Sequence, residues 1–187
     1  MTTPSLLHAH GCVGVSRRAF HQLRDAIEAA APGQSPAVLQ QAGFAGGAEL
    51  AFAFEDWTST RYGAAPPDLD VAYLGEALSG FLTETGWGAV TMEPLGPGVL
   101  ALDSTNWAES ERIDPPAPWP SCHFSAGLLS ELVSRASGAQ VAVLQVECVS
   151  SGQERCRFLL GAPETLAAIY DRVVAGQPYL ETVGGAA

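Results

Sequence analysis

The chain contains no lysine, and its nine basic residues are outnumbered by twenty acidic ones. The formal net charge of −11 argues against a nucleic-acid surface, because phosphate contacts depend on clustered positive charge. It argues equally against attraction to anionic lipids. Long apolar runs are also missing, and none approaches the ~20 residues that span a bilayer. Solubility is therefore the simplest role for the acidity.

Targeting and catalytic motifs are missing as well. Residues 1–15 have neither a basic segment nor a long apolar one, so we expect a cytoplasmic protein rather than a secreted one. There is no phosphate-cradling glycine loop, no GxSxG turn and no HExxH helix. No nucleophile stands beside an obvious base, and the residues favour a non-catalytic role.

What is present suits a folded protein. With 187 residues, of which 47% are apolar, the chain can form one domain with a sizeable core over residues 1–187. We expect flexible ends at about 1–12 and 181–187. Apolar spacing and capping residues predict helices after Ser16, from Ser35 to Trp57, from Asp68 to Gly86, from a Ser121 cap to Gly138, and from Pro163.

Two predicted hairpins separate these helices. Strands near 89–93 and 99–102 form the first, and the second surrounds residues 148–156. Such segregated hairpins predict an α+β fold, in which an antiparallel sheet of two hairpins packs against helices. We expect Gly43, Gly46 and Gly47 to interrupt the second helix, where they either leave room for a ligand or let another helix approach closely.

Three cysteines are the main candidates for chemistry. Cys148 and Cys156 flank a turn and should face each other across an antiparallel ladder, and Cys122 lies 26 residues upstream, at the start of a helix. Two such thiols could form a disulfide. A third converging thiol favours a metal, since three soft ligands satisfy most of a tetrahedral zinc shell. The alternative is three reduced core cysteines. Cys12 has no evident partner.

The segments CHFSAG from Cys122, VECVSSG from Val146 and CRF from Cys156 resemble the 4-vinyl reductase domain family, most clearly over 104–161. That family includes bacterial and archaeal ligand-binding proteins and the sensor domains of bacterial activators that respond to aromatics. Its fold is shared with TRAPP subunits and resembles the haem–nitric oxide sensing domain. The resemblance therefore implies that fold, and homodimerisation with it.

The resemblance also implies a structural zinc ion. In the aromatic-sensing members, cysteines at these spacings bind zinc, and a glutamate three residues before the second cysteine is the fourth ligand. Here that position is Gln145, a poorer ligand. Glu109, Glu147 or a water molecule could complete the shell instead, although strict alternation places Glu147 on the face opposite Cys148.

A buried ligand pocket between the helices and the sheet is a further implication of the resemblance. The aromatic residues of the helices support it, with ordinary core packing as the alternative reading. The candidate pocket residues are Phe44, Gly47, Phe54, Tyr73, Phe81, Trp107 and Phe124.

Three functions follow as hypotheses. The first is a stand-alone binding or sensing module for a small hydrophobic or aromatic molecule, with structural zinc and no organic cofactor. The second is a tetrapyrrole 4-vinyl reductase or its accessory, and the third is a non-catalytic protein-interaction module. The sequence has no ATPase segment and no DNA-binding motif, so a sensor would act through a downstream signalling protein.

Overall fold

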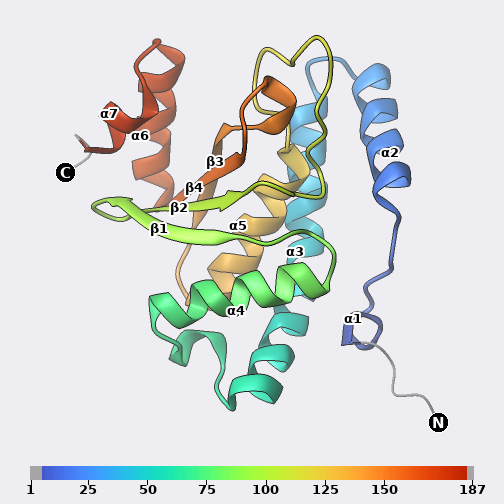
Figure 1. Cartoon of the computed structure of the whole chain (residues 1–187), viewed down its shortest axis with the longest axis vertical. Helices are drawn as coiled ribbons and strands as arrows, with labels where there is room; N and C mark the ends of the chain where they lie inside the picture. The colour runs from blue at the N-terminus through green and yellow to red at the C-terminus, as the bar shows by residue number, and fades with distance from the viewer. Residues whose placement is uncertain (1–5, 185–187) are drawn as a thin grey trace.

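The computed structural model describes residues 6–184, which form helices around a single sheet (Figure 1). Two short 3₁₀ turns, Pro66–Asp68 and Val149–Ser151, accompany the α-helices. The α-helices are α1 (Leu6–Ala9), α2 (Arg17–Ala30), α3 (Ser35–Tyr62), α4 (Val71–Glu84), α5 (His123–Ser137), α6 (Pro163–Val174) and α7 (Tyr179–Gly184).

The sheet has four strands in the order β1-β2-β4-β3, and every neighbouring pair is antiparallel. The first hairpin joins β1 (Thr91–Gly96) to β2 (Val99–Ser104), and the second joins β3 (Ala142–Glu147) to β4 (Cys156–Gly161). The predicted α+β fold of two hairpins is thus confirmed. The first strand lies two to three residues later than expected, because pairing continues through Pro94 to Gly96.

Helices cover both faces of the sheet. Phe158 and Leu160 of β4 enter the main core with α3, α4 and α5, whereas Leu159 meets Leu166 and Ile169 of α6 on the other side. Figure 1 shows α6 and α7 at the far side of the molecule from α2. This alternation along β4 gives the sheet two separate apolar layers.

Helices α3 and α5 touch through their main chains. A Cβ atom on Gly43 would lie 1.9 Å from the Phe124 carbonyl oxygen, and one on Gly127 would lie 1.9 Å from the Gln40 carbonyl oxygen. No side chain fits there, so these glycines permit the crossing. The prediction that glycines interrupt the second helix was wrong, since α3 runs unbroken past Gly43 and Gly47.

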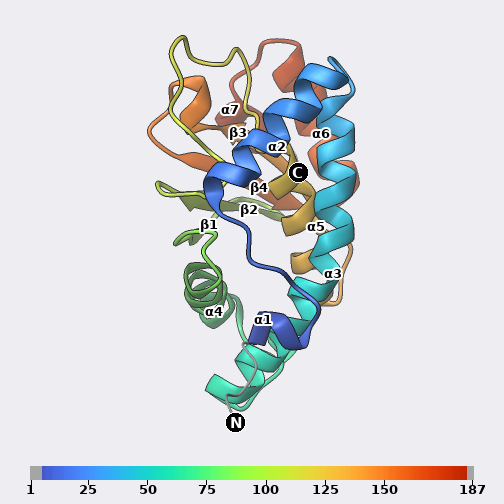
Figure 2. The ribbon, with the colours of Figure 1, turned by 90° about the vertical axis from the view of Figure 1, so that its right-hand side faces the viewer.

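The N-terminal part of the described chain lies on the surface of this core. Ser16 caps α2 as predicted, accepting a hydrogen bond from the Ala19 amide at 3.3 Å, but α2 has no buried residue. Figure 2 shows α1, the extended segment after it and α2 crossing the molecule along α3. This part, residues 10–17 above all, is called the strap below.

The C-terminal end differs from the expectation of a loose tail. Helix α7 runs to Gly184, with Thr182 and Val183 buried, and residues 185–187 lie outside the described chain. At its start the Tyr179 hydroxyl bonds Glu147 and Arg157 of the sheet. Within residues 6–184 no helix combines the length and apolarity needed to cross a membrane.

A candidate metal centre and an aromatic-walled cavity

The three predicted cysteines meet in one buried cluster. Their sulfur atoms all lie within 4.8 Å of one another, and each residue is at most 1% exposed. Cys148 is central, with its Sγ 3.6 Å from that of Cys122 and 3.9 Å from that of Cys156. All three are free thiols, so the disulfide alternative is not formed. The arrangement suits a thiophilic metal ion.

The environment of Cys148 favours its thiolate. Hydrogen bonds from the thiols of Cys122 and Cys156 hold the pKa of Cys148 far below its ordinary value, against the opposing effect of burial. The Ser150 hydroxyl lies 2.9 Å from the same sulfur. Because metals bind the thiolate, a ready anion at the centre of the cluster assists metal binding.

Cys122 is positioned by the start of α5, though not as predicted. Cys122 is the N-cap residue, and the expected cap Ser121 instead bonds Ser150 through its hydroxyl at 2.7 Å. The free amides of Phe124 and Ser125 donate to the Glu109 carboxylate at 3.1 and 2.7 Å. Glu109 therefore caps the helix, and its oxygens are already engaged as acceptors.

Glu109 is fully buried beneath this helix end. The Trp107 indole N–H donates to the Ser125 hydroxyl at 2.7 Å, which leaves that hydroxyl to donate to Glu109. Burial raises the pKa of Glu109 to about 7, although the Ser125 and Phe124 hydrogen bonds act in the opposite direction. Glu109 thus titrates near neutral pH despite its helix-capping contacts.

Gln145 reaches the cluster because β3 contains a bulge. The ladder pairs Gln145 with Phe158 and then Glu147 with Arg157, so Val146 is an extra residue. Gln145 consequently faces the core, and its Oε1 accepts a hydrogen bond from the Cys122 amide at 2.9 Å. Its Nε2 is buried and makes no hydrogen bond with any residue from 6 to 184.

Glu147 faces away from the sulfur atoms, as alternation predicted. Arg155 bonds its carboxylate at 2.8 Å, and the Tyr179 hydroxyl bonds it as well. Burial raises the pKa of Glu147, but these hydrogen bonds outweigh it and hold the pKa below its ordinary value. With Glu147 turned away and Glu109 capping α5, the described chain offers a metal three sulfur ligands and no fourth side-chain ligand.

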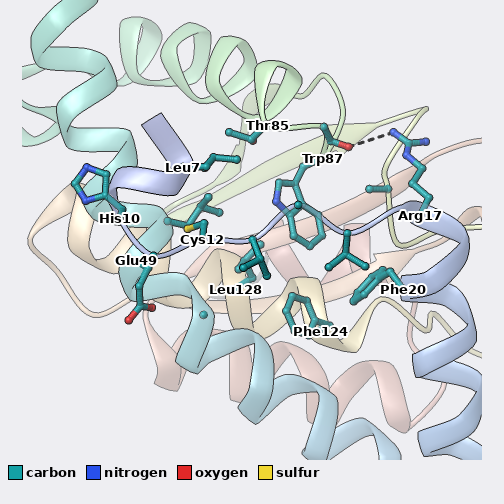
Figure 3. A pocket seen from close by; sticks show the side chains of 18 residues that line it. Leu7, His10, Cys12, Arg17, Phe20, Glu49, Thr85, Trp87, Phe124 and Leu128 are labelled. Carbon is teal, nitrogen blue, oxygen red and sulfur yellow. Dashed lines mark hydrogen bonds between the residues drawn. The ribbon is translucent and has the colours of Figure 1, made fainter. Parts of the chain in front are cut away.

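A cavity of ≈ 690 Å³ lies between the strap and the helical core. Phe20, Trp87 and Phe124 form its aromatic end; Phe20 meets Phe124 edge-on at 5.2 Å between ring centroids, and Trp87 stacks on Phe124 at 6.0 Å. Leu50 and Leu128 line it from α3 and α5. Figure 3 shows the strap passing over these side chains.

The strap brings polar groups to the cavity. Arg17 donates to the main-chain carbonyls of Gly86 and Asn106 at 3.3 and 3.4 Å. At the other end, His10 Nε2 lies 2.7 Å from an Asp56 carboxylate oxygen. The Cys12 thiol lines the wall between them, and burial together with Glu49 raises its pKa. These contacts hold the strap at both ends of an apolar space.

The predicted pocket residues are spread over the molecule. Of the seven, Phe124 lines this cavity. Phe54, Phe81 and Trp107 are packed in the main core. Phe44 and Tyr73 are 49% and 61% exposed, and Gly47 lies against α5.

Sequence reasoning missed the strap. Its only signals were the isolated residues His10, Cys12 and Val15, in a segment expected to be flexible. Phe20 was assigned to an apolar helix stripe, without a partner across the fold.

Comparisons with known proteins agree with the cysteine pattern. The model of the 4-vinyl reductase domain family matches residues 111–162, which confirms the resemblance drawn from these segments. No curated protein matched the chain by sequence.

Two solved structures establish the fold. The phenol-responsive sensory domain of the transcription activator PoxR, solved with phenol, has 19% identity and a TM-score of 0.63, covering 89% of this chain and 84% of that one. A vinyl-4-reductase family protein from Methanocaldococcus jannaschii has 17% identity and a TM-score of 0.51, covering 86% of this chain and 95% of that one.

Proposed function

We propose that this chain is a binding or sensing module for a small hydrophobic, aromatic molecule. The observation that carries the proposal is the cavity of ≈ 690 Å³ beneath the strap, which lies within the usual range of ligand pockets. Its walls combine three aromatic rings with leucines, and its polar groups stand at the rim. The phenol bound by the similarly folded PoxR domain supports the same ligand class.

Ligand entry would couple to the strap. Helix α2 has no buried residue, so the strap is held by Phe20 and by the polar contacts of Arg17 and His10. A ligand on the aromatic end adds apolar contacts to the strap that it otherwise lacks. Binding energy then favours the closed strap, whose surface a signalling partner could read.

We propose further that the cysteine cluster holds a structural metal ion. Zinc is the ion implied by the resemblance, and with Cys122, Cys148 and Cys156 as ligands it would take water as the fourth. Bound there, the ion would tie the second hairpin to the first residue of α5. Its folding energy would stabilise the region that carries Phe124 and Leu128.

Homodimerisation is part of the proposal as well. Phe44 and Phe52 are both 49% exposed on the outer side of α3, where a second copy could cover them. Sedimentation equilibrium of the wild-type chain and of Phe52→Ser tests this: a dimer that weakens in the variant supports it, and a monomer at all concentrations contradicts it.

The ligand site is tested by thermal unfolding with a panel of phenols and aromatic hydrocarbons. A ligand at a hundredfold excess over its Kd should stabilise the chain by about 2.7 kcal/mol. Gly46→Leu should abolish the shift without loss of fold, since a Cβ at Gly46, which lines the cavity, meets nothing within 4 Å. Gly47→Leu is unsuitable, because its Cβ would lie 2.9 Å from the Leu128 carbonyl oxygen.

Ala45→Leu is the matched control, with the same side chain added on an exposed neighbour outside the cavity. It should keep the ligand shift of the wild type. No stabilisation by any compound of the panel, or equal shifts in Gly46→Leu and Ala45→Leu, would contradict binding at this cavity and favour a protein-interaction role.

A further inference from the structure

Gln145 is the one residue of the metal centre whose chemistry does not suit zinc. Its Oε1 is occupied by the Cys122 amide, and its Nε2 is buried without a hydrogen-bond partner among residues 6–184. An amide nitrogen carries two hydrogens and no free lone pair, so it donates but cannot bind a metal. A glutamate of the same shape would keep one oxygen on the Cys122 amide and present its second oxygen where Nε2 now stands.

The remaining acids are committed elsewhere. Glu109 accepts hydrogen bonds from two amides at the start of α5, and Glu147 is bonded to Arg155 and Tyr179 on the opposite face of the sheet. The cluster is thus a three-sulfur site with a hydrogen-bond donor beside it. Four-coordinate zinc must recruit an outside ligand into this buried site, whereas three soft sulfurs alone satisfy a three-coordinate thiophilic ion.

We infer that Gln145 sets this centre for a three-coordinate soft cation, monovalent copper, and weakens its hold on zinc. The inference rests on the metal site proposed above and concerns its selectivity. The negative charge of the thiolates lies at the positive N-terminal end of α5, with the Ser150 hydroxyl 2.9 Å from Cys148 Sγ. The unpartnered Nε2 of Gln145 supplies a second donor in the same region, so no additional ligand is needed.

The test compares two affinities in three proteins. Reduced wild type, Gln145→Glu and Gln153→Glu are titrated without oxygen, with zinc against a zinc chelator and with monovalent copper against bathocuproine disulfonate. Gln153→Glu is the matched control, because it adds the same charge on an exposed residue of the hairpin turn. Gln145→Glu should bind zinc at least about tenfold more tightly while its copper affinity changes less than about threefold, as expected for an added oxygen ligand. Gln153→Glu should match the wild type.

Equal zinc affinity in the wild type and Gln145→Glu, or a parallel rise for both ions, would overturn the inference while leaving the metal site standing. Failure of the wild type to bind either ion would instead refute the site itself. X-ray absorption of copper-loaded wild type gives a test that needs no variant. Three sulfur neighbours and no lighter donor atom are expected, and a nitrogen or oxygen ligand would overturn the inference.

Discussion

The cysteine centre and the cavity lie at neighbouring ends of α5, yet they are built in opposite ways. The centre is closed on all sides, with its three sulfur residues at most 1% exposed and fixed by a helix start and a hairpin. The cavity has a firm floor on α3 and α5 but is covered by a strap whose helix α2 buries no residue. A ligand change at the centre should therefore alter global stability, and a change at the strap should alter local opening.

The largest effect should come from the centre. Cys148→Ser removes the sulfur that approaches both others, and with it metal binding. Because a structural metal can contribute about 10 kcal/mol in small zinc domains, the metal-loaded variant should melt far below the metal-loaded wild type. Differential scanning calorimetry with metal analysis measures this. Equal melting temperatures, with metal retained in both, would remove the contrast between the two regions.

The helix crossing should be nearly as sensitive. Gly127→Ala places a Cβ 1.9 Å from the Gln40 carbonyl oxygen and must separate α3 from α5, at a cost of about 3 kcal/mol or more. Gly46→Ala, on the cavity side, meets nothing within 4 Å and should be neutral or slightly stabilising. Urea unfolding of the pair compares them directly. A stable Gly127→Ala would mean that the two main chains are not in contact.

Glu109 adds a pH dependence to the closed region. Its pKa lies at about 7 in the folded chain against an ordinary value of 4.5, so between these values the folded state keeps a proton that the unfolded state loses. Stability should fall as pH rises from 4.5 to 7, by about 3 kcal/mol from this group, and be flat on either side.

Glu109→Gln does not titrate, so its stability relative to the wild type should rise over the same interval. Urea unfolding at pH 4.5, 6 and 8 measures the difference. A difference that does not change with pH would show that the carboxyl stays ionised in the folded chain.

The smallest effect belongs to the strap. Arg17→Ala removes two long hydrogen bonds to main-chain carbonyls, and should lower overall stability by about 1 kcal/mol or less. It should nevertheless speed amide exchange over residues 10–17 and ligand release from the cavity. Arg18→Ala, an exposed neighbour, is the control. Equal exchange in the two variants would show that Arg17 does not hold the strap.

The contrast also separates what the sequence could reveal from what it could not. The cysteines were predictable, since their spacing around one hairpin and one helix start is local. The inward direction of Gln145 follows from the bulge at Val146, which ordinary alternation does not foresee.

Glu109 and the strap were harder still, for a similar reason. Glu109 caps α5 from a loop, and only the folded chain brings the two together. The strap carries no helical stripe long enough to announce its contacts, and Phe20 finds Phe124 across more than a hundred residues of chain.

The glycine contact between α3 and α5 has a mechanical consequence. Two helices that meet main chain to main chain have no flexible side chains between them to absorb a displacement. Leu50, on the cavity wall, and Gly43, at the crossing, are parts of the same unbroken helix. A ligand that pushes on Leu50 would thus tilt α3 and α5 together as one lever, and the far arm of that lever is the helix start that carries Cys122.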